Sequence, residues 1–221
     1  MGRAAKLLEM YQAMQRVFGA SGWWPAESPL EVMVGAVLTQ NTAWANVDKA
    51  LARLKAANQL DFRALRALSE EALAELIRPA GFYRVKAARL KALLAWLDAA
   101  CGGELGQLAD TPSAALREQL LAVKGIGPET ADAILLYALG RPAFVVDEYT
   151  RRILSRHGLV EPEIGYEDLR AVFTDNLPAD REMYGEYHAY LVEVGKNWCK
   201  RQKPACAACP LLPFLDQDFY E

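Results

Sequence analysis

The sequence contains no apolar run long enough to span a membrane, because polar or charged residues break its hydrophobic segments. It also lacks a signal-peptide core at its start, where MGRAAKLLEMYQAM alternates charged and apolar residues. Hydrophobic residues make up 52% of the 221 residues, which excludes a disordered chain and provides enough core for one domain or two small ones. We therefore expect a folded, cytoplasmic protein with no membrane partner.

Positive charge is not in excess. Lysine and arginine number 25 against 28 aspartates and glutamates, which gives a net charge of −3. This balance counts against a broad electrostatic grip on nucleic acid. Backbone amides and local lysine or arginine side chains can still hold individual phosphates on an acidic protein.

Histidine and cysteine are scarce. The two histidines, His157 and His188, stand in no ligand or nucleophile pattern, so we expect structural roles for both. Three of the four cysteines lie within residues 199–209. In a cytoplasmic chain such a group favours a metal site over a disulfide. The fourth, Cys101, ends a predicted helix and is expected to be structural.

Strand patterns, repeats and low-complexity segments are also absent, and helical periodicity runs through the chain. In the segment 84–100, for example, leucines recur at i, i+3, i+4 and i+7. The sequence therefore predicts an all-α protein. The predicted helices span residues 3–19, 30–38, 43–56, 69–79, 84–100, 113–122, 128–139, 148–157, 166–175 and 180–198.

The most informative stretch runs from Leu120 to Arg152. In it the turn KGIG, residues 124–127, joins two predicted helices and is followed by Pro128, which suits a first helical position. Gly125 and Gly127 permit backbone conformations and a close approach that a Cβ would forbid. The turn amides and the helix N-terminus can receive one phosphate, with Lys124 beside them. This pattern predicts a helix-hairpin-helix that contacts a nucleic-acid backbone.

The strings GIGPETADAILLYALGR and FVVDEYTRRI resemble the endonuclease III-like helix-hairpin-helix (HhH-GPD) DNA glycosylases. The resemblance extends from Trp23 to Cys209. It implies a central helical-barrel lobe at 26–140, with the helix-hairpin-helix at about 113–139. A second lobe would combine residues 1–25 with 141–221, including a cysteine-rich loop at 199–216. A DNA-binding cleft is expected between the two lobes.

Asp147 matches the essential aspartate that follows the hairpin in this family. Breaking an N-glycosidic bond builds positive charge on the sugar, which a fixed carboxylate stabilises. The same carboxylate can orient or deprotonate the attacking water. The alternative is that Asp147 is the N-cap of a helix that begins near Glu148. The two roles can coexist.

Glu129 departs from the family members that also cut the DNA backbone. Those members carry a lysine in GxGxKTA, whose amine forms a Schiff base with the sugar. A carboxylate cannot form an imine, so the resemblance implies a monofunctional enzyme without the lyase step. Glu129 can alternatively be an acid placed against the dipole of its helix.

Base chemistry on duplex DNA requires extrusion of the nucleotide, and the hole that it leaves must be filled. Gln40 matches the family position whose side chain fills this hole, and Phe82 matches the opposing wedge. An exposed loop amide and an ordinary core ring are the respective alternatives.

The strings WWP and LTQNTAW, which contain Trp24 and Trp44, resemble those of the 3-methyladenine subclass of the family. In that subclass aromatic rings sandwich the flipped base. The segment that begins at Glu129 resembles the same subclass. An alkylated purine is cationic, so it stacks well on such rings and leaves without protonation. The alternative is that the tryptophans only pack the lobes.

The spacing Cys199-x6-Cys206-x2-Cys209 resembles the start of the family's iron–sulfur loop. The fourth cysteine of that loop would fall at position 215, where this chain has Leu215. The resemblance implies a 4Fe–4S cluster whose fourth ligand is not cysteine, with Asp216 one step from the expected position. Zinc is a second option, and three free cysteines are the third.

Together these features predict a bacterial-type, nucleoid-associated, monomeric DNA repair glycosylase without a nucleotide cofactor. Its partner would be double-stranded DNA that contains damaged bases, and its substrates alkylated purines of the 3-methyladenine type. One alternative is a glycosylase for oxidised pyrimidines or mismatched bases. Another is a non-catalytic helix-hairpin-helix DNA-binding protein, for which a carboxylate at Asp147 would have no use.

Overall fold

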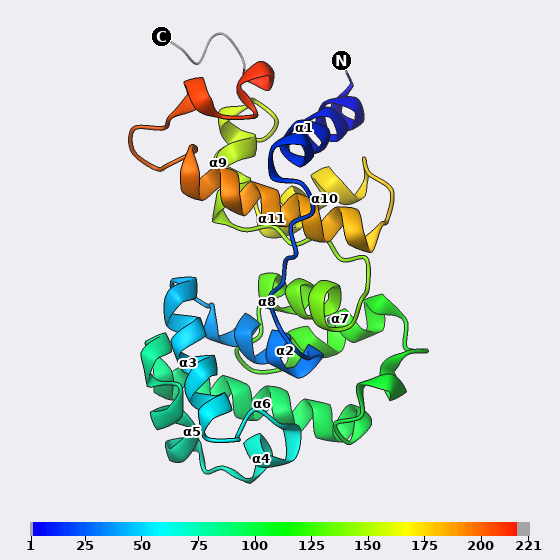
Figure 1. The fold of residues 1–221 in the computed structure, drawn as a ribbon. Helices are drawn as coiled ribbons and strands as arrows, with labels where there is room; N and C mark the ends of the chain where they lie inside the picture. Colours follow the sequence, from blue (N-terminus) through cyan, green and yellow to red (C-terminus); the bar gives the residue numbers. More distant parts are fainter. Residues whose placement is uncertain (1, 216–221) are drawn as a thin grey trace. The chain divides into compact units, whose positions relative to one another are not determined.

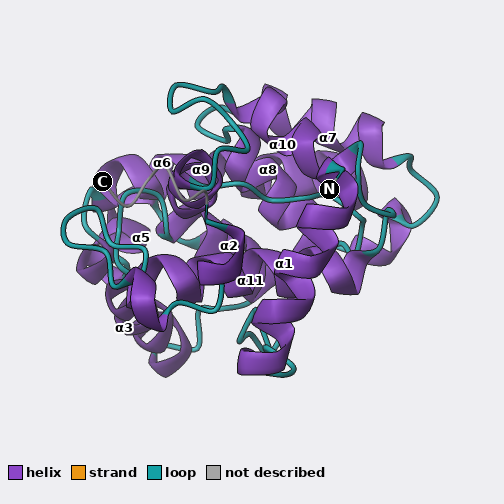
Figure 2. Cartoon of the chain, turned by 90° about the horizontal axis from the view of Figure 1, so that it is seen from above, coloured by secondary structure: helices purple, strands orange, loops and turns teal. Residues whose placement is uncertain are grey.

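The computed structural model describes residues 2–215. Within these residues the chain forms eleven α-helices, α1 to α11, and five short 3-10 or π-helical segments, η1 to η5. Figure 2 shows helices and loops and no strand in this part of the chain. The predicted all-α class is confirmed. None of the described helices is both long enough and apolar enough to cross a membrane.

The chain divides into two compact units. The central unit is Ala26–Arg141, and the terminal unit is formed by the described residues of Met1–Pro25 and Pro142–Glu221. The central unit holds α2 (Pro29–Leu38), α3 (Trp44–Ala56), α4 (Phe62–Ala67), α5 (Glu70–Leu76), η1 (Arg78–Ala80), α6 (Tyr83–Cys101), η2 (Leu105–Leu108), α7 (Ser113–Ala122), α8 (Pro128–Ala133) and η3 (Ile134–Ala138). The terminal unit holds α1 (Arg3–Phe18), α9 (Glu148–Arg156), α10 (Tyr166–Thr174), α11 (Arg181–Asn197), η4 (Cys206–Ala208) and η5 (Leu212–Phe214).

The core of the central unit is built on α2 and α6. Almost every residue of α2 is buried, because its apolar sequence PLEVMVGAVL contacts α3, α6, α8 and η3. In α6 the predicted leucine face is buried against α2, α4 and α5 (Figure 1). Each fully buried leucine contributes roughly 1.5–3 kcal/mol. The hairpin helices α7 and α8 are therefore attached to a well-packed scaffold.

The core of the terminal unit is built on α11, which packs against α1 and α9 (Figure 1). Tyr184 and Tyr187 on α11 are buried, and Phe144 stacks on Phe173 at a ring-centroid distance of 3.9 Å beside them. Phe144 also begins a buried segment that continues through Val145 and Val146. This buried segment fixes the place where α9 begins, and Asp147 stands at that point.

Two elements differ from the sequence expectation. The helix predicted over 128–139 is regular only as far as Ala133, and continues as one π-helical segment, η3. The short helix α4 was not predicted; it begins where Asp61 accepts hydrogen bonds from two backbone amides, and it packs on α6. Six residues carry too little periodicity to be recognised in the sequence.

A buried lysine connects two loops of the central unit. Lys86 is 1% exposed, and its ammonium group donates hydrogen bonds to Leu38 O and Ala80 O, both at 2.8 Å, and to Thr42 Oγ1 at 2.6 Å. Burial, with a smaller contribution from the charge of Arg89, lowers the pKa of Lys86 to about 8. The side chain is therefore still mostly protonated at neutral pH, and its three N–H donors match three acceptors.

We expect Lys86→Met to lower the free energy of unfolding by about 2–4 kcal/mol, because Leu38 O would lose its donor and Ala80 O would keep only Thr42 Oγ1. Urea denaturation followed by circular dichroism measures this change. The exposed Lys49 on α3 supplies the control, and Lys49→Met should change stability by less than about 0.5 kcal/mol. Equal effects of the two substitutions would contradict the structural role of Lys86.

Candidate functional site

The hairpin of the central unit consists of α7, the turn Lys124–Gly127 and α8. Gly125 has a φ of +89°, and a Cβ at this position would collide with the side chain of Arg89. Ile126 is buried and its amide donates a hydrogen bond to Val123 O, which fixes the turn to the core of the central unit. Lys124 and Gly125 of the same turn are exposed. The turn therefore presents glycine backbone to solvent, where a phosphate can approach it.

An ion pair connects the two hairpin helices. Arg117 on α7 donates from Nε to Asp132 Oδ1 at 2.7 Å and from Nη2 to Asp132 Oδ2 at 3.0 Å. Asp132, on α8, is 0% exposed. A bidentate pair of this kind fixes both distance and orientation. The spacing of α7 and α8, and with it the shape of the turn, is set by this contact.

Gln40 is brought to the hairpin. Its Nε2 donates to Gly125 O at 3.1 Å and to Thr130 Oγ1 at 2.9 Å, and Arg89 Nη1 donates to its Oε1. Gln40 is therefore not a loop amide that only faces solvent. Every polar atom of its side chain is used inside the central unit, and the short segment between α2 and α3 is tied to the turn.

Phe82 lies between η1 and α6 and is exposed over 71% of its surface. Its φ of +45° is unusual for a residue with a large side chain. A core role for this ring is excluded by its exposure. A large apolar side chain is therefore exposed to solvent at this turn. The turn itself is fixed two residues earlier, where Ala80 O accepts a hydrogen bond from Lys86.

The remaining predicted residues of the central unit are Glu129 and Trp44. Glu129 is exposed in the first turn of α8, and Trp44 is half-buried as the first residue of α3. In the terminal unit Trp24 is half-buried, and its ring lies 5.8 Å from that of Trp23, measured between centroids. Lys196 lies over the Trp23 ring at 5.4 Å.

Asp147 caps α9. Its Oδ1 accepts hydrogen bonds from Thr150 N at 2.8 Å and from Thr150 Oγ1 at 2.9 Å. The capping alternative is therefore confirmed as geometry, and it uses one carboxylate oxygen. The other oxygen, Oδ2, lies 3.9 Å from Nε2 of His188, and the side chain of Asp147 keeps 14% of its surface exposed. A carboxylate held in this way by one oxygen has a fixed orientation for the other.

His188 was not recognised from the sequence as a neighbour of Asp147. It is buried on α11, four residues after the buried Tyr184, so its place on the apolar stripe of that helix was the available signal. Burial lowers its pKa, the charge of Asp147 opposes this shift, and Lys196 adds to it. The histidine therefore lies beside the carboxylate in the interior of the terminal unit, at a distance longer than a hydrogen bond.

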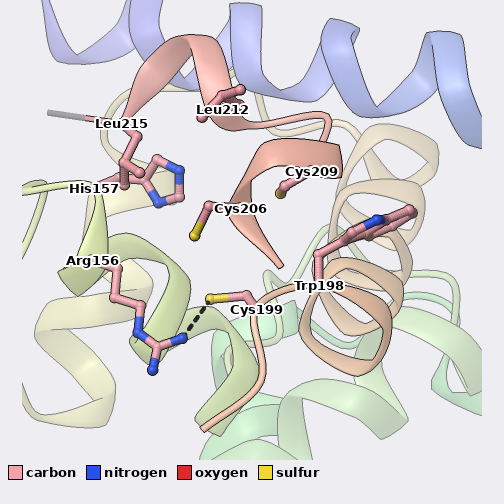
Figure 3. Close-up of a pocket in the computed structure, with 8 residues that line it drawn as sticks. All are labelled: Arg156, His157, Trp198, Cys199, Cys206, Cys209, Leu212 and Leu215. Atoms are coloured by element: carbon pink, nitrogen blue, oxygen red, sulfur yellow. Dashed lines mark hydrogen bonds between the residues drawn. The ribbon is translucent and has the colours of Figure 1, made fainter. Parts of the chain in front are cut away.

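The three clustered cysteines line one cavity of the terminal unit (Figure 3). Cys199 follows α11, whereas Cys206 begins η4 and Cys209 follows it. The other lining residues are Arg156, His157, Trp198, Leu212 and Leu215. Arg156 donates from Nη1 to Cys199 Sγ at 3.3 Å, and burial, with the charges of the other two thiols, raises the pKa of Cys209.

The cavity also bears on the expected metal ligands. Among residues 2–215 no group of three or more histidine, cysteine or acidic side chains has the arrangement of a metal-ion site. Leu215 occupies the position of the expected fourth ligand, and its side chain lines the cavity. Asp216 falls outside the described residues.

An all-helical fold, a hairpin with exposed glycine backbone and an oriented aspartate at the start of the helix that follows define the class of helix-hairpin-helix DNA glycosylases. Residues 34–179 match the HhH-GPD superfamily of base excision DNA repair proteins, and the chain belongs to this family. It is a DNA glycosylase of base excision repair.

Three similar proteins illustrate the relationship. A protein of Methanocaldococcus jannaschii, named as a DNA repair glycosylase, is 44% identical over 209 residues, which are 94% of each chain. The structure of H. pylori 3-methyladenine DNA glycosylase (MagIII) bound to 1,N6-ethenoadenine matches with a TM-score of 0.76 and 29% identity, over 89% of this chain and 98% of that one. A non-covalent endonuclease III–DNA complex matches with a TM-score of 0.81 and 26% identity, over 97% and 96%.

We expect Arg117→Met to destabilise the protein by about 3–5 kcal/mol, because the guanidinium would be removed from a fully buried carboxylate. The double variant Arg117→Met/Asp132→Leu should recover most of this loss in urea denaturation. Arg78→Met is the control: its partner Glu75 and Arg78 itself are more than half exposed, and the cost should stay below about 1 kcal/mol. A loss at Arg117 no larger than this control would contradict the prediction.

Proposed function

We propose that this glycosylase hydrolyses the N-glycosidic bond of alkylated purines of the 3-methyladenine type in duplex DNA and leaves an abasic site. The absence of a lyase step is inferred from Glu129. This residue is exposed in the first turn of α8, where the bifunctional members of the family have lysine. The substrate class is supported by Trp24 and Trp44 and by the likeness to the MagIII structure, which holds 1,N6-ethenoadenine.

Asp147 is the proposed catalytic residue. Departure of the base leaves positive charge on the sugar, and Oδ2 is the carboxylate oxygen available to stabilise it or to activate water, since Oδ1 is used by Thr150. An N-alkylated purine is already cationic and is a good leaving group, so no second acid is needed to protonate it. One oriented carboxylate is then sufficient for hydrolysis.

The central unit supplies the proposed DNA contacts. Lys124, Gly125 and Gly127 would bind a backbone phosphate at the hairpin, and the exposed Phe82 would enter the base stack as a wedge. Gln40 would fill the hole left by the flipped nucleotide. To do so, its amide must exchange the hydrogen bonds to Gly125, Thr130 and Arg89 for contacts to DNA.

The cysteine cavity is the proposed site of a 4Fe–4S cluster. In such a cluster each cysteine binds a different iron, so the sulfur atoms surround the cluster instead of converging on one ion. The three thiols line one cavity, and their C-x6-C-x2-C spacing resembles that of the family's iron–sulfur loop. The cluster would fix the loop that carries Lys200 and Arg201, whose side chains are available to phosphates.

Removal of oxidised pyrimidines or mismatched bases is the second candidate, because the endonuclease III–DNA complex matches the fold with the higher TM-score of 0.81. The two candidates differ in the pocket. Aromatic side chains favour a cationic purine, whereas a neutral oxidised pyrimidine gains less from them. Base release from a panel of duplexes with a single lesion decides between the two substrates.

We expect Asp147→Asn to reduce base release by about 100-fold or more, because the amide carries no negative charge for the sugar. Asparagine caps helices as well as aspartate does, so α9 should persist and binding to duplex DNA should be spared. Base release is measured in single-turnover reactions and binding by fluorescence anisotropy.

The matched control for this variant is Asp180→Asn, at the N-cap of α11, where Asp180 accepts from Met183 N at 2.7 Å. It should leave base release within about twofold of the unchanged protein. Retained base release in the Asp147 variant would contradict a catalytic role for Asp147, and loss of DNA binding together with base release would indicate a structural role instead.

We expect reactions of the unchanged protein on lesion-containing duplexes to break strands only after treatment with alkali. Borohydride should trap no protein–DNA adduct, since Glu129 provides no amine for a Schiff base. A denaturing gel, with and without alkali, reports both results, and a lysine-containing endonuclease III serves as the positive control. Strand breakage without alkali would contradict the monofunctional assignment.

A further inference from the structure

The cavity that the three cysteines line contains one more side chain with a metal-binding atom. His157 follows α9 directly, is 5% exposed and lines the same cavity as Cys199, Cys206 and Cys209. Figure 3 shows its imidazole beside Leu215, the residue at the position of the fourth cysteine. The other lining residues, Arg156, Trp198, Leu212 and Leu215, offer no lone pair for iron.

The hydrogen bonds of His157 indicate which nitrogen is protonated. Nδ1 lies 2.7 Å from Ile153 O, and Nε2 lies 3.3 Å from Leu211 O. Both oxygens only accept hydrogen bonds, and a neutral imidazole has one N–H to give. The shorter contact assigns this proton to Nδ1. Nε2 then carries a lone pair whose nearest polar contact is another acceptor.

Nε2 is directed at Leu211 O, an atom that cannot donate a hydrogen bond to a lone pair. In this tautomer the lone pair is therefore buried without a donor, on a ring that lines the cavity together with the three thiols. This is the usual state of a metal-binding histidine, which donates its second N–H to a backbone carbonyl.

We propose that Nε2 of His157 is the fourth protein ligand of the iron–sulfur cluster, in the place that Leu215 cannot fill. The proposal rests on the cofactor proposed above. Histidine ligation of iron–sulfur clusters is chemically established and raises their reduction potential relative to thiolate. The acidic residue Asp216 and a solvent ligand are the alternatives that the test must separate from it.

The direct test is pulsed electron paramagnetic resonance on the reduced cluster of the full-length protein, purified without oxygen and labelled with 15N only in histidine. We expect one strong 15N hyperfine coupling from a directly bound imidazole. A protein that contains iron and shows no such coupling would overturn the assignment of His157 while leaving the cluster intact. A protein without iron after reconstitution would overturn the cofactor proposal and this one together.

Substitutions give an independent readout. His157→Cys should keep its iron, lose the 15N coupling and show a lower reduction potential, because thiolate replaces imidazole. His157→Ala should lose iron, and His157→Ala/Leu215→Cys should regain it through a cysteine at the family position. His188→Ala and Asp216→Ala are the controls, and both should retain the 15N coupling. Full iron content in His157→Ala, or loss of iron in Asp216→Ala with no 15N coupling in the unchanged protein, would overturn the proposal.

Discussion

The start of α9 depends on the two hydrogen bonds by which Thr150 holds one oxygen of Asp147. They begin α9 at a fixed residue and leave the second oxygen oriented beside His188. The same helix ends at Arg156 and His157, which line the cysteine cavity. One nine-residue helix therefore carries the proposed catalytic carboxylate at its start and the proposed iron ligand at its end, and its packing on α11 keeps both in place.

In the central unit, too, hydrogen bonds fix the residues of the candidate site, and here they connect separate loops. Lys86 ties the end of α2 to the turn before Phe82, and Gln40 ties the following segment to the hairpin. The residues proposed to contact DNA are thus linked to one another inside a single unit.

Helical periodicity was sufficient to predict the long elements. The leucine face of α6 is buried as expected, because a 3.6-residue repeat specifies one apolar face whatever it packs against. The short α4 and the π-helical continuation of α8 were not predictable, since neither has a local pattern of its own. The partners of Gln40 lie 85 and 90 residues away in sequence, and no periodicity reveals such pairs.

The sequence by itself determined the all-α class, the hairpin, the spacing of Asp147 and the three cysteines, because each depends on local residue type and order. Only the tertiary structure decided which oxygen of Asp147 is used by the cap, that His188 lies beside the other oxygen, and that His157 shares a cavity with the cysteines. Neither histidine stands in a local pattern, so their roles arise only when the folded chain brings distant segments together.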